Sequence, residues 1–182
     1  ERAVTTNHIA AHLGMSPGNL YYHFRNKQQI IAELVAAYEA NVEGYLQVPQ
    51  GRPLDLQDKA NYLESISQGL WQYRFLLRDL EHLVSADPDM AERYRQFSRR
   101  CLHSGQAIYQ GLIDAGVLCA RRANPEVLAL NSWLLMNSCV SFLCTTVLEA
   151  DQTELTPAML RRGVYQVLAQ EMGLLTEQAR PA

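Results

Sequence analysis

The sequence lacks the strict alternation of apolar and polar residues that marks a half-buried β-strand. Its apolar residues recur at helical spacing instead. It also lacks internal repeats and low-complexity segments. A hydrophobic content of 48% in 182 residues is ample for a packed core, which argues against disorder. We therefore predict an all-α protein, built as one sizeable domain or as a small domain joined to a medium one.

Catalytic signatures are also missing. The sequence has no Gly-rich phosphate loop, no G-x-S-x-G, no H-E-x-x-H, and no Cys or Ser in a recognisable nucleophile motif. We therefore expect no enzyme and no cofactor. His8 and His12 have the four-residue spacing of metal ligands on a helix, but no third ligand lies near them. We interpret them as solvated or phosphate-facing histidines and expect no metal site.

The sequence has few cysteines, and their spacing does not match a disulfide or metal-binding motif. The four cysteines form no C-x-x-C pair, and three of them lie in apolar helical stretches; they are Cys101, Cys119, Cys139 and Cys144. This pattern indicates reduced, buried thiols in a cytoplasmic protein. The alternative is a redox sensor, which would need an exposed and activated thiolate.

Charge is absent from Val127 to Leu148, a run of 22 residues that is long enough to span a bilayer. Seven polar residues interrupt the run, which suits a helix buried between other helices better than a helix in lipid. We therefore expect no membrane segment. The seven are Asn131, Ser132, Asn137, Ser138, Ser141, Thr145 and Thr146.

Apolar periodicity and capping residues together predict the helices. Ser-Pro, Asp-Pro, Asn-Pro and Thr-Pro pairs supply an N-cap followed by proline at the first helical position. A turn-rich segment at 47–53 is the only obvious linker. The predicted helices are 6–13, one that starts at Ser16-Pro17, 27–45, 55–71, 73–84, 88–115, an uncharged helix from 125 to about 150, and 157–173.

The segment from Thr5 to Lys27 is the most informative. It predicts a helix, a tight turn at Gly14 and a second helix, with Ile9, Ala10 and Leu13 on the inner face of the first. In the second helix Leu20 and Phe24 point inward, and the outward face has donors, acceptors and flat rings but no carboxylate. Residues 1–27 have a net charge of +2, whereas the rest of the chain has −5. Such a face suits a recognition helix in a major groove.

At these residues the sequence resembles the TetR family of bacterial regulators. The family motif is matched in order and spacing by Ile9-Ala10, Gly14-Met15-Ser16, Gly18-Asn19-Leu20-Tyr21-Tyr22-His23-Phe24 and Asn26-Lys27. The resemblance is specific over residues 4–35. It implies a helix-turn-helix domain at 1–46 and an all-helical ligand-binding and dimerisation domain at 47–182. The family has one more helix before this motif, so we expect the first domain to be incomplete at its N-terminus.

The resemblance also implies roles for individual residues of the motif. Thr5 or Thr6 would hold a phosphate, and Tyr21, His23 and Lys27 would contact the DNA backbone. The residues that would face bases are Ser16, Pro17, Gly18, Asn19 and Tyr22. The expected partner is double-stranded operator DNA, and the expected protein is a homodimer.

In the second domain the resemblance implies a ligand pocket and a dimer face. Large apolar side chains and one amide within the apolar helix are the candidate ligand contacts: Trp71, Phe75, Phe97, Tyr109, Trp133 and Asn137. Core filling is the commoner role for each large side chain, and an interhelical hydrogen bond is the alternative for Asn137. The last two helices are expected at the dimer interface, with Val140, Val164 and Leu168 in it. The expected function is a repressor released by a small hydrophobic or amphipathic effector. The alternative is a helical regulator that senses redox state through its cysteines.

Overall fold

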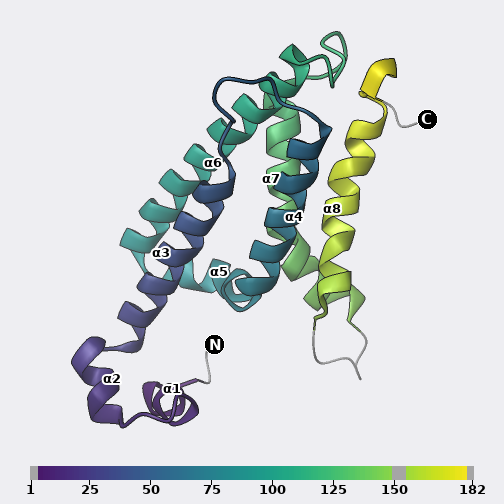
Figure 1. The fold of residues 1–182 in the computed structure, drawn as a ribbon. Helices are drawn as coiled ribbons and strands as arrows, with labels where there is room; N and C mark the ends of the chain where they lie inside the picture. Colours follow the sequence, from purple (N-terminus) through teal and green to yellow (C-terminus); the bar gives the residue numbers. More distant parts are fainter. Residues whose placement is uncertain (1–3, 149–154, 180–182) are drawn as a thin grey trace. The chain divides into compact units, whose positions relative to one another are not determined.

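The computed structural model describes residues 4–148 and 155–179, and over these residues it contains helices and turns with no strand (Figure 1). An isolated bridge between Leu118 and Leu175 is the only strand-like contact there. The predicted all-α class is therefore confirmed. The elements are α1 (Thr6–His12), α2 (Pro17–His23), α3 (Lys27–Tyr45), α4 (Leu56–Gln72), α5 (Arg74–Ala86), α6 (Pro88–Asp114), α7 (Pro125–Phe142), a π-helix η1 (Leu143–Val147), α8 (Pro157–Met172) and a 3-10 helix η2 (Glu177–Ala179).

The predicted caps explain where the helices begin. The Asp87, Asn124 and Thr156 side chains each accept a hydrogen bond from a backbone N–H of the first turn, and a proline occupies the next position. Proline costs nothing there, because the first N–H groups of a helix have no partner inside it. These local signals place the starts of α6, α7 and α8 where the sequence predicts them.

The uncharged helix differs from its prediction. It is α-helical only to Phe142 and then widens into η1, where Leu143 is completely buried. The last part of the predicted segment, residues 149 and 150, lies outside the described residues. A π-helical turn adds a residue to the repeat and rotates the following side chains, which hydrophobic periodicity alone does not reveal.

The chain divides into two compact units after Ala40, inside α3, while the predicted domain boundary after Leu46 stays a prediction. The first unit contains α1, α2 and the start of α3. The second begins at Asn41 and contains the remaining helices. The linker belongs to the second unit, where the Tyr62 hydroxyl donates to the Gln47 carbonyl over 2.6 Å and the residue that follows the linker, Leu54, is buried.

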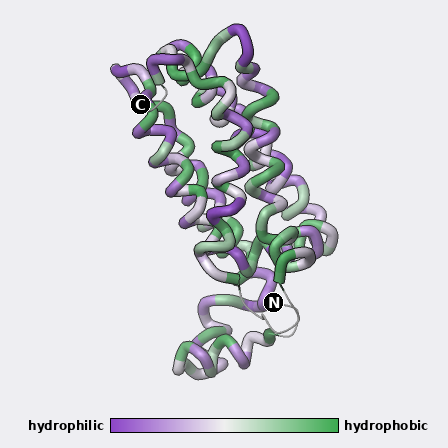
Figure 2. The backbone as a smooth tube through the Cα atoms, turned by 90° about the vertical axis from the view of Figure 1, so that its right-hand side faces the viewer, coloured by the Kyte–Doolittle hydropathy of each residue, from purple (hydrophilic) through white to green (hydrophobic). Residues whose placement is uncertain are grey.

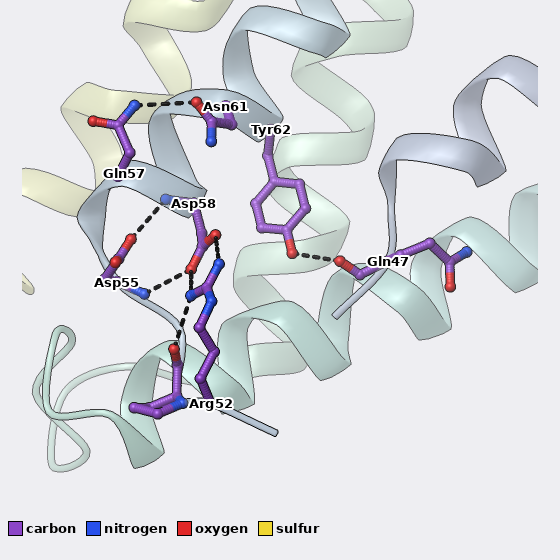
Figure 3. Close-up of polar contacts among 8 residues, drawn as sticks. Gln47, Arg52, Asp55, Gln57, Asp58, Asn61 and Tyr62 are labelled. Atoms are coloured by element: carbon purple, nitrogen blue, oxygen red, sulfur yellow. Dashed lines mark hydrogen bonds and ion pairs between the residues drawn. The ribbon is translucent and has the colours of Figure 1, made fainter. Parts of the chain in front are cut away.

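An ion pair anchors this linker to the start of α4 (Figure 3). The Arg52 guanidinium donates to both carboxylate oxygens of Asp58 at 2.6 Å. Asp58 also accepts from the Asp55 backbone N–H, while its own N–H donates to the Asp55 side chain. Hydrogen bonding from Arg52 lowers the pKa of Asp58 to about 2, so this carboxylate stays ionised at neutral pH.

In the second unit α6 packs along α7, α7 along α8, and α8 along α4 (Figure 1). Hydrophobic and hydrophilic residues are interspersed along the helices of the chain (Figure 2). The α7–α8 contact is close at Gly163, where a Cβ would lie 2.8 Å from the Cys139 Sγ. The large side chains that are completely buried include Phe97, Leu112, Val140, Leu143, Leu160 and Val167.

A buried polar network crosses this apolar packing. The Lys59 Nζ on α4 lies 2.8 Å from a Glu171 carboxylate oxygen on α8 and 3.1 Å from the Tyr109 hydroxyl on α6. Tyr109 also donates to Glu171 and shares a 2.6 Å hydrogen bond with Ser132 on α7. Burial lowers the pKa of Lys59, and Glu171 opposes that shift by attracting the ammonium. Four helices therefore meet at one charge pair.

The stretch Pro125–Val147 is long and apolar enough to cross a membrane by length and composition alone. About a third of its most apolar window is buried inside the chain. Several large apolar side chains of this stretch therefore remain exposed, among them Val127, Leu130 and Leu134.

We predict that Lys59→Met will destabilise the second unit by about 3 kcal/mol, because it leaves the Glu171 carboxylate buried without its cation. The double variant Lys59→Met/Glu171→Gln should recover most of that loss, since the neutral amide still accepts from Tyr109. Urea unfolding followed by circular dichroism measures both. Losses that simply add in the double variant would contradict a coupled pair.

Candidate nucleic-acid interface

The first unit begins with a capped helix. The Thr5 hydroxyl accepts from the His8 backbone N–H at 3.2 Å, and the His8 ring Nδ1 accepts from the Thr5 N–H at 3.4 Å. This reciprocal cap satisfies two of the backbone donors that a helix start leaves unpaired. His8 therefore has a structural role at the start of α1. Across the described residues, no three His, Cys, Asp or Glu side chains gather into a metal site.

Close packing joins α1 to α2 after a sharp turn. Gly14 has a φ of +66°, the left-handed conformation that ends α1 and redirects the chain. Ala10 is completely buried and Leu20 is 3% exposed. The prediction that Leu13 lies on the inner face is wrong, because it is 61% exposed. Leu13 is the C-cap of α1, where the chain already turns away, and no described residue covers it.

A side-chain contact that the sequence does not predict fixes the two helices together. The Thr6 hydroxyl on α1 lies 3.0 Å from the Tyr21 hydroxyl on α2. The residues are 15 positions apart, so only the tertiary structure brings them together. Tyr21 remains about half exposed, and its ring is held at the edge of the outward face.

The outward face of α2 collects most of the predicted base-reading residues. Ser16 caps the helix by accepting from the Asn19 backbone N–H at 3.2 Å. Tyr22 is 85% exposed, and its ring meets the His23 ring edge-on at 5.1 Å between centroids. Side chains that are exposed together here belong to Ser16, Pro17, Asn19, Tyr21, Tyr22 and His23, with the Gly18 backbone between them.

Negative charge is absent from this part of the chain. No Asp or Glu occurs from Val4 to Ala32, while Arg25 and Lys27 are cationic. Lys27 is the first residue of α3, and the Asn26 side chain before it accepts from the Gln29 N–H at 2.9 Å. Lys27 is half-buried and already has an interaction within the chain. The segment from Val4 to Ala32, which contains α1 and α2, can therefore approach a polyanion without repulsion from a carboxylate of its own.

The predicted ligand residues do not form one cluster. Phe97 on α6 is completely buried against Trp133 on α7, at 5.9 Å between ring centroids. Both ends of the Asn137 amide are engaged, since it accepts from the Tyr94 hydroxyl at 3.0 Å and donates to the Trp133 carbonyl at 2.9 Å.

The other three candidates lie elsewhere. Tyr109 belongs to the network around Glu171, and Phe75 on α5 is 38% exposed. Trp71 lines a groove between α4 and α8.

The predicted dimer residues also separate. Val140 is 0% exposed within a single chain, so it has no surface left for a partner and does not fit an interface. Val140 lies on the side of α7 that packs against its own chain, together with Met136 and Cys139. Val164 and Leu168 line the groove between α4 and α8. The exposed apolar side chains of α7 are Val127, Leu130, Leu134 and Phe142.

All four thiols are free, and they differ in environment. Cys101 and Cys139 are buried, and burial raises the pKa of Cys139. A hydrogen bond from Arg122 lowers the pKa of Cys119. Cys119 is therefore the one shifted thiol that favours the redox-sensing alternative, which stays a hypothesis.

We predict that Gly14→Ala will destabilise the first unit by about 1–2 kcal/mol, the cost of a left-handed conformation for a residue with a Cβ. Nothing lies within 4 Å of that Cβ, so the cost is conformational alone. Gly18→Ala is the matched control, because its Cβ would meet only the Ser16 hydroxyl at 4.0 Å inside a regular helix. Hydrogen exchange of α1 and α2 amides measures both, and equal effects would contradict the assigned role of Gly14.

Two family models match the chain. One, described as bacterial regulatory proteins of the tetR family, matches residues 2–34, and the other, the TetR bacterial transcriptional repressor model, matches residues 37–182. None of the curated proteins compared with the chain matches it.

Solved structures agree with the family models. A TetR-family transcriptional regulator from Marinobacter aquaeolei VT8 is 44% identical, covers 98% of this chain and 84% of its own, and superposes with a TM-score of 0.85. Two structures share the fold at low identity. A TetR regulator from Haloarcula marismortui is 14% identical over 97% of this chain and 89% of its own, with a TM-score of 0.67. A SmeT–triclosan complex is 15% identical over 99% and 86%, with a TM-score of 0.62. The chain therefore belongs to the TetR family of bacterial transcription regulators.

Proposed function

We propose that this protein is a transcriptional repressor that binds a two-fold symmetric operator as a homodimer. A small hydrophobic or amphipathic effector would release it from the DNA. The observation that carries the proposal is the exposed, carboxylate-free face of α2, where Asn19, Tyr22 and His23 lie together on a short helix fixed to α1. Such a repressor would act in the cytoplasm, because bacterial DNA is located there.

Different residues would do different work on DNA. Asn19 and Tyr22 would contact base edges, because amide and phenol groups match the donors, acceptors and methyl groups of the major groove. Thr5, Thr6, Tyr21, His23 and Lys27 would hold the phosphate backbone and set the position of α2. The Thr6–Tyr21 hydrogen bond supports this assignment, since it positions two of these hydroxyl groups side by side.

The operator test compares two kinds of variant in the full-length protein. Tyr22→Ala and Asn19→Ala should lose discrimination between operator and random DNA by about tenfold or more, since each base contact contributes about 1–3 kcal/mol. Lys27→Gln should weaken binding to both DNAs and reduce the salt slope by about one unit. Gln28→Ala, an exposed uncharged neighbour, is the control. Unchanged operator preference in both α2 variants would remove the base-reading role.

The dimer proposal rests on the exposed side of α7. Val127, Leu130 and Leu134 are 50%, 44% and 54% exposed, and their spacing places them on one stripe of the helix. Phe142 at 55% exposure extends the stripe. A run of apolar side chains facing water is unfavourable for a monomer, and a second copy would cover it. A two-fold axis would also present two α2 helices about one DNA turn apart.

We predict that Leu130→Glu and Leu134→Glu will raise the dimer dissociation constant at least about a hundredfold, because the carboxylates of both copies would be desolvated in one interface. Leu56→Glu on α4, at 43% exposure, is a matched control that should stay dimeric. Sedimentation measures the association state, and circular dichroism checks that helicity is retained. Dimers that persist in both α7 variants would place the interface elsewhere.

Release by a small effector is supported by the family to which the chain belongs and by one structure of the same fold. The SmeT structure is a complex with triclosan, an example of a small molecule bound to a protein of this fold. In such a regulator the effector acts only through its different affinity for the DNA-competent and DNA-incompetent conformations.

A further inference from the structure

A groove of about 500 Å³ runs between α4 and α8, a volume in the range of small-molecule sites. Its walls are mostly apolar, with Leu63 on α4 and Val164 and Leu168 on α8. The rings of Trp71 and Tyr165 add aromatic surface. An apolar chain placed here would be shielded from water on two sides.

The two helices run antiparallel, and this sets the ends of the groove. Lys59 at the start of α4 pairs with Glu171 at the end of α8. Trp71 at the end of α4 therefore lies toward the start of α8, where Arg161 also lines the groove. The helical rise makes the distance from Lys59 to Trp71 about 18 Å. That length suits a medium-length acyl chain.

The cations at the two ends of the groove differ in whether they can bind an added anion. The Lys59 ammonium is already neutralised by Glu171 at 2.8 Å and holds the Tyr109 hydroxyl as well. Arg161 is exposed and forms no ion pair with another residue of 4–148 or 155–179. Among the described residues that line the groove, Arg161 is therefore the cation without an ion pair.

A second guanidinium adds positive charge at the same end. The Arg74 Cζ lies 3.9 Å from the centre of the Trp71 ring, and this side chain donates to the Trp71 carbonyl at 2.7 Å. One face of the indole is covered by a cation in this way. The groove also contains one carboxylate, the exposed Glu64, which accepts from Gln68 at 3.2 Å.

We propose that this groove binds an amphipathic anion, with its carboxylate at Arg161 and its alkyl chain between Leu63, Val164 and Leu168. The role of that anion as the effector rests on the proposed function. Guanidinium and carboxylate pair through two parallel hydrogen bonds, which fixes the orientation of the head. A ligand held this way bridges α4 and α8 and changes how far apart they can lie.

The binding experiment uses Trp71 as its reporter. The chain has two tryptophans, so Trp133→Phe leaves Trp71 as the single indole. Dodecanoate, dodecanol and dodecyltrimethylammonium are titrated below their micelle-forming concentrations while Trp71 emission is recorded. Dodecanoate should bind at least about tenfold more tightly than the cationic probe. No emission change with dodecanoate, or tighter binding of the cation, would overturn the proposal.

Three charge variants in the same Trp133→Phe chain locate the head group. Arg161→Gln should weaken dodecanoate binding about tenfold, as expected for loss of one charge-assisted pair. Glu64→Gln should strengthen it, because a like charge is removed from the groove. Arg162→Gln is the matched control, since this neighbouring arginine is exposed and lies outside the groove. Equal effects at Arg161 and Arg162 would mean nonspecific attraction and would refute the site.

Ligand binding in the groove and the proposed repressor function can be tested independently of each other. Binding of dodecanoate is measured without DNA, so it stands even if the protein binds no operator. Operator affinity of the full-length protein is then measured with and without dodecanoate. Dodecanoate binding that requires Arg161 but leaves operator affinity unchanged would support the site and contradict its role as the effector site. Operator binding with no dodecanoate binding would overturn the groove proposal alone.

Discussion

The buried pair of Lys59 and Glu171 lies at the point where α4, α6, α7 and α8 meet, and removing one partner would leave a buried charge unpaired. Tyr109 and Ser132 complete the hydrogen bonding, so both charges are satisfied in a place that water does not reach. A buried pair of this kind is costly to break and gains little over apolar packing, but it fixes which helix turns lie opposite each other. This contact joins the start of α4 to the end of α8, the two helices that line the groove.

Two kinds of surface follow from that packing. The inner side of α7, with Val140 and Met136, is buried within its own chain. Leu130 and Leu134 on the opposite side remain exposed to solvent. On α8 the close approach at Gly163 draws the helix against α7, while Val164 and Leu168 turn toward α4. A helix that is apolar nearly all round can therefore serve a core and an interface at once, and its neighbour can serve a core and a groove.

The first unit follows a different principle. It is small, and its buried apolar side chains are few: Ala10, Leu20, Val35 and Tyr38 among the described residues. Reciprocal capping at Thr5 and His8, the left-handed Gly14 and the Thr6–Tyr21 contact supply much of its local definition. These interactions do not use the side chains of Asn19 and Tyr22, which stay exposed. A surface that recognises another molecule needs exposed side chains on a rigid element.

The sequence by itself determined the helices, because their signals are local: a cap such as Ser16 or Asn124 acts on backbone groups within one turn, and Gly14 acts through its own φ. It also determined the family, through a motif whose spacing falls within one short segment. Only the tertiary structure decided that Leu13 is exposed, that Val140 is buried and that Lys59 meets Glu171 across 112 positions. An apolar or charged residue shows its type in the sequence, but which neighbour covers it depends on how distant helices pack.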